Sequence, residues 1–239
     1  MDKRDLSIVI PAKNEGIGLT ITCEMLAMFV DSLKEIIVVV EDTFDKSSES
    51  AANARLSSDV ELRIVVNNFQ AGVTGSLCTG IEVALGEFVM LYPADEINPI
   101  FEIQNFVLAL RSGFDVVSAT RYAKGGKRLG VGVLSGNVLS RGVSILFQIA
   151  TLGKISDPTT GLKAFRKSMW QMEQVFSTVS WSYPMELQIE FLKRGRKFIE
   201  VPIVSVDRPF DGQSSFKFGL WIWNYLRVLY YATFRRHKE

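Results

Sequence analysis

The first half of the chain alternates short apolar runs, rich in β-branched residues, with longer segments that have helical spacing. The runs predicted to be strands are Leu6–Ile10, Glu35–Val40, Glu61–Val66, Phe88–Tyr92 and Asp115–Ala119. The segments predicted to be helices are Ile17–Val30, Lys46–Ser58, Gly75–Leu85 and Pro99–Arg111. Nearly continuous apolar strands that alternate with helices are typical of a parallel sheet covered on both faces. The pattern therefore predicts an α/β fold with a mostly parallel sheet.

Polar loops follow the first four predicted strands. Because strand–helix–strand crossovers are right-handed, these loops should meet at one edge of the sheet, where open α/β sheets bind their ligands. Asp95 follows a buried strand at this edge. A carboxylate in that position can hold a divalent cation, and the cation can hold a phosphate. The four loops are Pro11–Gly16, Glu41–Asp45, Asn67–Thr74 and Pro93–Asn98.

Each of the first three loops also has an ordinary structural interpretation. Asn14 with Glu15 suits the start of a helix, Asp45 suits a helix cap, and the stretch from Gly72 to Gly75 suits a plain turn. The two glycines do not form the GxGxxG pattern with a downstream acid, so a dinucleotide-binding fold has little support. The expected convergence of the loops on one edge is what favours a binding site.

The second half of the chain lacks this regular alternation. The stretch 131–153 is apolar but interrupted by polar residues, which predicts an amphipathic segment and no clear membrane span. No linker, repeat or low-complexity tract divides the chain, so we expect one domain over residues 1–217 and a C-terminal helix within 218–239. The remaining predicted elements are a strand at Leu162–Phe165, a helix at Tyr183–Lys193, a strand at Lys197–Val206 and a helix at Phe218–Phe234.

Composition and charge narrow the function classes. The 239 residues are 47% hydrophobic, and the net charge of +1 argues against a nucleic-acid binder. Five bases and no acid lie between Arg121 and Arg141, which fits phosphate contact or a solvated basic face. His237 is the only histidine, which excludes a Ser-His-Asp triad and an HExxH zinc site. Cys23 and Cys78 lack metal-ligand spacing, and no secretory signal precedes the first strand, so a cytoplasmic location is expected.

Short motifs in a fixed order carry a family resemblance. In the first half they are Pro11-Ala12-Lys13-Asn14-Glu15, Glu41-Asp42, Ala71-Gly72, Ala84-Leu85-Gly86-Glu87-Phe88-Val89 and Ala94-Asp95. In the second half they are Arg121, Gly125-Gly126, Arg128, Asn137, Asp157-Pro158-Thr159-Thr160-Gly161-Leu162-Lys163-Ala164-Phe165-Arg166, and Arg208 with Gly212-Gln213-Ser214. Over residues 6–217 the chain thus resembles the family 2 glycosyltransferases of the GT-A fold. Within that family it resembles the branch of dolichol-phosphate mannosyltransferases and polyprenyl-phosphate glycosyltransferases.

The resemblance implies an inverting, metal-dependent transfer of a sugar from a nucleotide-sugar donor to a polyprenyl phosphate, in cell-envelope glycan synthesis. Asp95 would bind Mg²⁺ or Mn²⁺ on the donor diphosphate, and Asp157 would lie by the reacting centre. The implied catalytic residues are Asp95, Asp157 and Arg128. The implied donor site comprises Pro11, Asn14, Glu15, Asp42, Gly72, Ala94 and Asp95. The implied phosphate-binding residues are Arg121, Arg128, Arg208 and Lys217.

The chain departs from the family pattern at several positions. Pro93 stands where the family has the first acid of Asp-x-Asp. Glu96 could replace that acid, but on an extended segment its side chain would point away from that of Asp95. These departures keep a second interpretation open, a catalytically impaired glycosyltransferase-like partner protein. The other departures are Glu41-Asp42-Thr43-Phe44 for Asp-Asp-Gly-Ser, Thr74 for a glycine, and Ser215 for a lysine, with Lys217 two positions further on.

The acceptor is predicted from the ionisation of a lipid phosphate, and the location from the composition of the C-terminal segment. A lipid phosphate is already anionic at neutral pH and needs no strong base, which suits a chain without an internal histidine. The segment Phe218–Phe234 is short for a bilayer span, but its Trp and Tyr residues and the bases that follow are typical of an interfacial helix. We expect peripheral association with the cytoplasmic face of a membrane through this helix. A membrane protein or a second copy of the chain is a further candidate partner, and a soluble glycan acceptor or a helix packed on the domain is the alternative.

Overall fold

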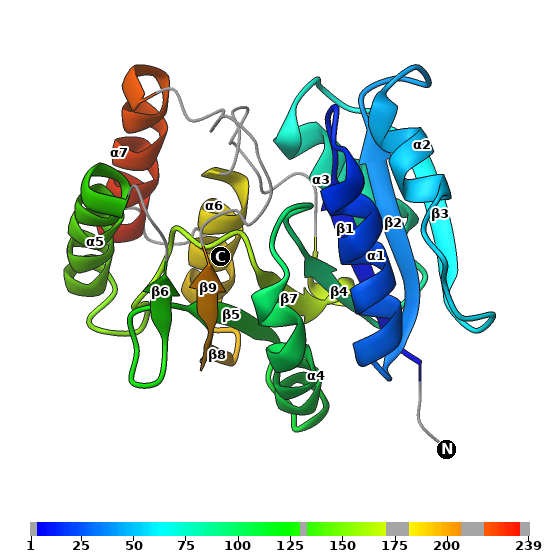
Figure 1. The fold of residues 1–239 in the computed structure, drawn as a ribbon. Helices are drawn as coiled ribbons and strands as arrows, with labels where there is room; N and C mark the ends of the chain where they lie inside the picture. The colour runs from blue at the N-terminus through cyan, green and yellow to red at the C-terminus, as the bar shows by residue number, and fades with distance from the viewer. Residues whose placement is uncertain (1–3, 130–132, 171–181, 207–217, 235–239) are drawn as a thin grey trace.

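One twisted sheet organises the molecule (Figure 1). The computed structural model describes residues 4–129, 133–170, 182–206 and 218–234, with backbone alone for 133–139 and 218–222. In this part of the chain, seven strands form the main sheet, and β7 runs antiparallel to its two neighbours while the other pairs are parallel. In spatial order the strands are β3 (Glu61–Val66), β2 (Leu33–Val40), β1 (Leu6–Pro11), β4 (Phe88–Leu91), β7 (Lys163–Arg166), β5 (Val116–Thr120) and β8 (Phe198–Pro202).

Helices cover both faces of the sheet because the central strands are apolar on both sides. Successive residues of β1 point to opposite faces, so that Ile8 packs in one core and Val9 in the other. The core around Ile8 is covered by α1 (Ile17–Phe29), α2 (Lys46–Ala52), the 3₁₀ turn η1 (Asn98–Glu102) and α4 (Ile103–Arg111). The core around Val9 is covered by α3 (Val73–Val83) and α6 (Ser182–Lys193). The predicted α/β class is therefore confirmed.

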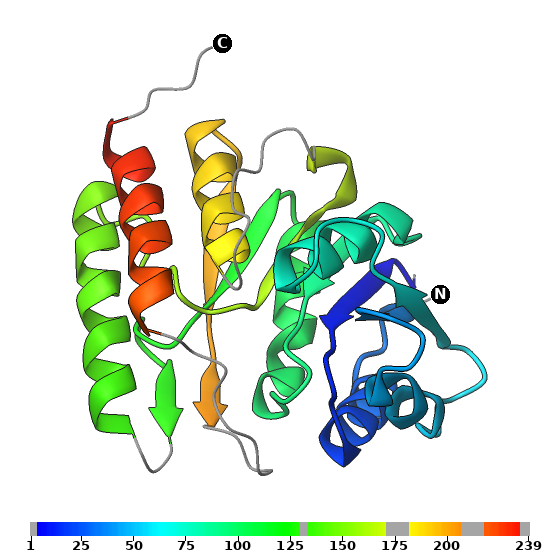
Figure 2. The same ribbon diagram turned by 90° about the horizontal axis from the view of Figure 1, so that it is seen from above.

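Three helices lie side by side beyond the β8 end of the sheet, as both views show (Figures 1 and 2). They are α5 (Val133–Ala150), α6 and α7 (Phe218–Phe234), and α7 contacts both of the others. A separate small core, which includes Phe147, Met185 and Val228, joins them. Next to this group, β6 (Lys127–Leu129) and β9 (Val204–Val206) form a two-stranded parallel sheet.

The predicted elements correspond to observed ones, most of them within one or two residues at each end, and three differ more. The helix expected at Lys46–Ser58 ends at Ala52, before a stretch that begins with Asn53 and contains residues of low helix propensity. The helix expected at Pro99–Arg111 begins as a 3₁₀ turn. The strand expected at Lys197–Val206 is divided into β8 and β9, which belong to different sheets, because the chain leaves the main sheet after Pro202.

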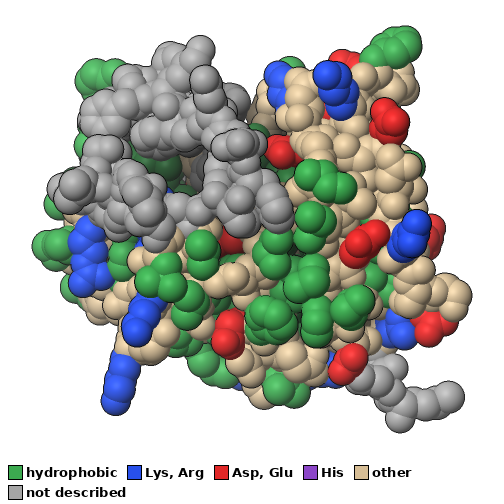
Figure 3. All heavy atoms as spheres, viewed as in Figure 1, with side chains coloured by type: hydrophobic (Ala, Val, Ile, Leu, Met, Phe, Trp, Pro, Cys, Tyr) green, Lys and Arg blue, Asp and Glu red, His purple; other side chains and the backbone are tan. Residues whose placement is uncertain are grey.

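Hydrophobic side chains also gather on the face formed by α1, η1 and α4 (Figure 3). There Phe29 and Phe101 meet edge to face with their ring centroids 5.3 Å apart, and Met28 is 71% exposed. None of the helices in the described ranges combines the length and the hydropathy that a bilayer crossing requires.

Candidate active site

The loop after β1 is anchored on the start of α2. The backbone N–H of Asn14 donates to Asp45 Oδ1 at 2.9 Å, and that of Glu15 donates to Ser47 Oγ at 2.8 Å. Asp45 also accepts from the Ser47 N–H at 2.8 Å, so it caps α2 as the ordinary interpretation predicts. Burial opposes ionisation of Asp45, but the hydrogen bonds from Ser47 and Asn14 outweigh it and lower the pKa. Asn14 is not a helix cap, because α1 begins only after Gly16.

Glu41 ties the loop after β2 to the loop that precedes α3. Its Oε1 accepts from the Gly72 N–H at 3.0 Å, the Ser76 hydroxyl at 3.1 Å and Asn67 Nδ2 at 3.3 Å. Gly72 adopts φ 104° directly before α3, a conformation that glycine reaches without strain. A Cβ added to Gly75 would lie 1.8 Å from the Gln70 carbonyl oxygen, so the first turn of α3 also requires a glycine. The loops at the predicted donor-binding edge are thus connected by hydrogen bonds to one another and to the helices that follow them.

The chain turns directly after β4, where the predicted metal ligand lies. The Ala94 carbonyl accepts from Thr22 Oγ1 of α1 at 2.9 Å, and Asp95 follows in the turn, partly buried. Because this segment turns, the side-chain alternation of an extended strand does not apply to Glu96. Glu96 is hydrogen-bonded to Ser205 of β9, and its pKa is raised by burial and by the charges of Asp95 and Asp157, against the effects of Ser205 and Arg121.

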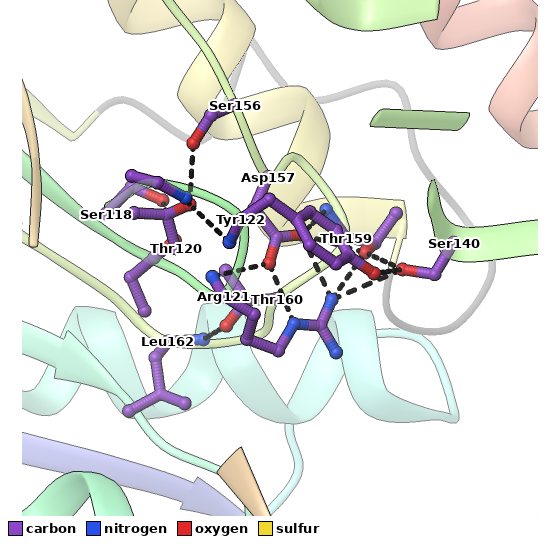
Figure 4. A network of polar contacts seen from close by, with 12 residues as sticks. Ser118, Thr120, Arg121, Tyr122, Ser140, Ser156, Asp157, Thr159, Thr160 and Leu162 are labelled. Carbon is purple, nitrogen blue, oxygen red and sulfur yellow. Dashed lines mark hydrogen bonds and ion pairs between the residues drawn. The ribbon is translucent and has the colours of Figure 1, made fainter. Parts of the chain in front are cut away.

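A buried ion pair connects the end of β5 with the loop before β7 (Figure 4). Arg121 donates from Nε to Asp157 Oδ2 at 2.7 Å, from Nη2 to Oδ1 at 3.0 Å, and from its backbone N–H to Oδ2 at 3.0 Å. Asp157 also accepts from the Thr159 N–H and hydroxyl, at 3.3 and 2.9 Å. Burial opposes ionisation of Asp157, but the charge of Arg121, its hydrogen bonds and the charge of Lys163 outweigh burial and hold the pKa of Asp157 below the ordinary 3.8. Asp157 is therefore an ionised carboxylate at neutral pH, occupied in orienting Arg121.

Helix α5 contacts this ion pair, and the charge of Arg121 acts on α7. Ser140 of α5 accepts from Arg121 Nη2 at 3.3 Å and from the Tyr122 hydroxyl at 2.8 Å. The Arg141 guanidinium lies 4.7 Å from the centroid of the Tyr122 ring, a cation–π contact. Burial raises the pKa of Tyr225 of α7 to about 12, and the nearby Arg121 charge opposes that rise. Helix α5 is thus hydrogen-bonded to the ion pair, and Tyr225 of α7 lies within the influence of its charge.

The structure brings several of the sequence-predicted site residues into one electrostatic cluster. Asp95, Arg121 and Asp157 all act on the pKa of Glu96. Arg128 lies in β6 opposite Ser205, the partner of Glu96. Arg208 and Lys217 lie outside the described residues.

The sequence of the chain matches the profile of a known family. Residues 7–171 match the profile of the family described as Glycosyl transferase family 2. The chain belongs to this family.

Two relatives are similar in sequence to this family 2 glycosyltransferase. A dolichol-phosphate mannosyltransferase of Pyrococcus furiosus is 28% identical over 231 residues, which cover 94% of this chain and 62% of the relative. An undecaprenyl-phosphate 4-deoxy-4-formamido-L-arabinose transferase of Pectobacterium carotovorum is 25% identical over 222 residues, which cover 91% of this chain and 64% of the relative. The chain thus spans less than two thirds of the length of either relative.

The solved structures share the fold. Glucosyl-3-phosphoglycerate synthase of Mycobacterium tuberculosis with Mn²⁺, UDP and phosphoglyceric acid superposes with a TM-score of 0.72 at 17% identity, covering 98% of this chain and 80% of the other. The same enzyme with Mg²⁺ and UDP gives a TM-score of 0.72 at 17% identity, with 96% and 79% covered. The predicted GT-A-type fold is confirmed.

Within the described residues of this family 2 glycosyltransferase, a divalent metal fits as an ion held jointly by a carboxylate and a substrate. No group of three or more His, Cys, Asp or Glu side chains within the described residues could hold a metal by itself. Mg²⁺, however, is commonly bound by one or two carboxylates together with phosphate oxygens and waters. Asp95 offers such a carboxylate at the end of β4, and its donor chemistry suits a cation that arrives with a diphosphate.

Sequence reasoning assigned no role to several residues that shape the site. Glu41 was considered with Asp42 as a departure from the family pattern, yet it is Glu41 that binds the Gly72 loop, while Asp42 Oδ1 accepts from the Phe44 N–H at 2.8 Å. Lys163 and Glu200 are charged residues in strand segments that are otherwise largely apolar. A charge within a buried strand is the sequence signal that could have singled them out.

Proposed function

We propose that this chain transfers a sugar from a nucleotide-sugar donor to a polyprenyl phosphate, with inversion at the anomeric carbon and with Mg²⁺ or Mn²⁺. The observation that carries the proposal is the Arg121–Asp157 pair, because Arg121 donates to Ser140 of α5 and its charge acts both on Glu96 after β4 and on Tyr225 of α7. Arg121 is thus a cationic group whose charge acts on both the proposed donor edge and a helix that we propose contacts lipid. The two relatives, whose names specify dolichol phosphate and undecaprenyl phosphate, support a polyprenyl phosphate as the acceptor.

The donor is assigned to the loops at the strand ends. Pro11, Asn14, Glu15, Asp42 and Gly72 would contact the nucleotide, and Ala94 with Asp95 would contact the diphosphate. Asp95 would hold the cation, which offsets the charge that develops on the leaving diphosphate. The UDP and Mn²⁺ or Mg²⁺ in the solved structures of the same fold support this assignment.

The acceptor phosphate is assigned to the basic side of the site. Arg121 and Arg128 would bind phosphate oxygens, with Arg208 and Lys217 contributing from outside the described residues. An acceptor phosphate oxygen would attack the anomeric carbon while the bond to the nucleotide diphosphate breaks. Asp157 already accepts several hydrogen bonds, so we assign it to orientation of Arg121 and not to proton removal. The attacking phosphate needs no general base because it is largely ionised at neutral pH.

Exposed apolar side chains on α5 and α7 support peripheral contact with the cytoplasmic face of a membrane. Ile149 of α5 is 70% exposed and Trp223 of α7 is 74% exposed, and Leu152 follows α5 on the surface. Helices that display Trp and aliphatic residues in this way favour the boundary between lipid headgroups and acyl chains. We therefore assign residues 1–217 to the transferase domain. We assign membrane contact to α7 together with α5.

A turnover assay tests the proposed reaction. The protein is incubated with a panel of nucleotide sugars, Mg²⁺ or Mn²⁺, and a short-chain polyprenyl phosphate, and the glycolipid product is measured. Asp95→Asn should lower kcat by roughly 10²- to 10³-fold, the loss typical of removing one group that stabilises developing charge. Asp59→Asn, an exposed carboxylate paired with Arg4, is the matched control and should leave the rate unchanged.

The second candidate function, a catalytically impaired partner protein, is favoured by Pro93 alone. Absence of turnover with every donor, together with an unchanged UDP–Mn²⁺ thermal shift in Asp95→Asn, would support it and contradict the transferase.

Liposome flotation separates a lipid acceptor from a soluble glycan acceptor. The double variant Ile149→Ser/Trp223→Ser should lose liposome binding, whereas Met28→Ser, an equally exposed apolar residue on α1, should not. If the unchanged chain does not float with anionic liposomes, the soluble acceptor becomes the better hypothesis.

A further inference from the structure

A row of polar side chains crosses the buried sheet next to the Arg121–Asp157 pair. Lys163 of β7 lies opposite Ser118 of β5, and Ser118 lies opposite Glu200 of β8. Cross-strand partners have their side chains on the same face of a sheet, so the three residues form one line. Lys163 and Ser118 are fully buried, and Lys163 Nζ donates to Ser118 Oγ at 2.7 Å.

The Glu200 end of this row reaches the backbone of the site. The Ser156 N–H donates to Glu200 Oε1 at 2.9 Å and to Oε2 at 3.0 Å, and the Asp157 N–H donates to Oε1 at 3.3 Å. Glu200 thereby fixes the two residues at the start of the loop that carries the Arg121 partner. A displacement of this backbone would move the Asp157 carboxylate, and with it the guanidinium of Arg121.

The Lys163 end of the row supplies the compensating charge. Glu200 and Asp157 both favour the charged form of Lys163, and Lys163 in turn favours the ionised forms of both carboxylates. Gln188 of α6 closes the row from above the sheet, where its Oε1 lies 3.4 Å from Ser118 Oγ. A buried ammonium costs more free energy than apolar packing of similar volume, so stability alone does not explain a lysine at this position.

We propose that Lys163 and Glu200 are positioning residues for the transfer reaction. Lys163 places a charge at one end of the polar row through its bond to Ser118, and Glu200 at the other end holds the Ser156–Asp157 backbone so that Asp157 orients Arg121. This inference rests on the proposed function, in which Arg121 binds a phosphate.

The positioning of Arg121 by Lys163 and Glu200 should depend on pH near neutrality. Burial lowers the pKa of Lys163 to about 7, against the opposing charges of Asp157 and Glu200, and Arg121 lowers it further. These are the charged groups that face the ammonium from the loops and strands around it, and Gln188 of α6 and Ser118 of β5 are neutral. As the pH rises through this value the ammonium is lost, and the orientation of Arg121 should loosen.

The pH profile of turnover tests the proposal. In the unchanged protein, kcat should fall by about tenfold per pH unit above the Lys163 pKa, the dependence expected for a single essential ionisation. Lys163→Arg should remove this alkaline decline because a guanidinium stays charged. Lys163→Met should lower kcat at every pH with little change in the donor KM. Glu200→Gln should move the decline to lower pH, because it removes a charge that favours the ammonium.

The control variant is Lys167→Met. Lys167 lies four residues along the chain, and its Nζ donates to the carbonyls of Glu82 and Ala84, away from the polar row. Its pH profile should match that of the unchanged protein. An alkaline decline that persists unaltered in Lys163→Arg and Glu200→Gln would overturn the proposal.

An NMR measurement separates failure of this inference from failure of the proposed reaction. The Arg121 Nε–H bond to Asp157 should give a distinct ¹⁵N–¹H signal, assigned by its loss in Arg121→Lys. That signal should shift as the pH of the unchanged protein rises through about 7, and it should be displaced in Lys163→Met but not in Lys167→Met. This readout needs no turnover, and the titration is carried out on the unchanged protein. A signal that is constant across this pH range would overturn the positioning role even if the transferase is active.

Discussion

Replacing Asp157 with asparagine should reveal how much the buried ion pair contributes to folding. The carboxylate is fully buried and accepts hydrogen bonds from Arg121 and Thr159 through both of its oxygens. An asparagine side chain has the same shape, but its NH₂ group would replace one of these accepting oxygens and would face hydrogen-bond donors. The substitution would also leave the Arg121 guanidinium without its counter-charge. Removing one member of a buried pair typically costs about 3–5 kcal/mol, because the other charge stays buried and uncompensated.

The magnitude can be measured by urea unfolding of the unchanged protein and of Asp157→Asn, followed by circular dichroism at neutral pH. The matched control is Asp59→Asn, because Asp59 also pairs with an arginine, at 3.1 Å, but is 64% exposed. An exposed pair of this kind contributes about 0–1 kcal/mol. We therefore expect a large difference in unfolding free energy between the two asparagine variants, although both lose the same charge.

Acid provides a second test of the same reasoning. The pKa of Asp157 is lower in the folded protein than its ordinary 3.8, so its contribution to stability is complete above the unfolded value and is lost as the pH falls through the folded value. The stability difference between the unchanged protein and Asp157→Asn should therefore narrow below about pH 4. The assignment of a strong buried pair would be refuted if the unfolding free energies of the two proteins differed by less than about 1 kcal/mol at neutral pH. It would also be refuted if their difference did not change as the pH is lowered.

Three further predictions concern other parts of the molecule. Gly80→Ala should lower the urea midpoint, at a cost of about 1–3 kcal/mol, because its Cβ would lie 2.2 Å from Val9 Cγ1. Glu41→Gln should weaken UDP–Mn²⁺ binding in a thermal-shift titration, because the Gly72 loop loses its anionic anchor. The contribution of Lys163 to stability should rise from about pH 7 toward pH 10.5, with a limiting slope of about 1.4 kcal/mol per pH unit, because unfolded Lys163 binds a proton over that range that folded Lys163 does not. Urea midpoints of Lys163→Met across the same range should lack that contribution.

The first half of the fold could be predicted because local sequence and tertiary environment agree there. The segment Glu61–Val66 was predicted to be a strand with its observed limits, and Leu6–Ile10 differs from β1 by a single residue. In both cases β-branched residues form a run whose length suits a strand. The second half was less predictable because its elements depend on distant partners. The chain crosses from the main sheet to the small one after Pro202, and no local pattern marks that change.

The site shows the same division between local and distant information. The loops after the parallel strands could be placed at one edge from topology alone, and Asp45 as a helix cap from residue type. The pairing of Arg121 with Asp157 joins residues 36 positions apart, and neither residue type nor spacing specifies it. The row from Lys163 to Glu200 requires the strand order β7-β5-β8, in which an antiparallel strand enters a parallel sheet.

Pro93 acquires a different meaning once the charges around it are considered together. The family pattern has an acid at that position, and its absence leaves Asp95 as the carboxylate assigned to the cation. The turn after β4, however, brings Glu96 into the cluster with Arg121 and Asp157, where burial and the charges of Asp95 and Asp157 raise its pKa. A site whose carboxylates disfavour one another's ionisation is one in which added positive charge is stabilising. A cation that arrived with the donor diphosphate, as proposed above, would therefore be stabilised by this cluster, and a weaker dependence of turnover on Mg²⁺ or Mn²⁺ in Glu96→Gln, with Asp95 intact, would show that this charge matters.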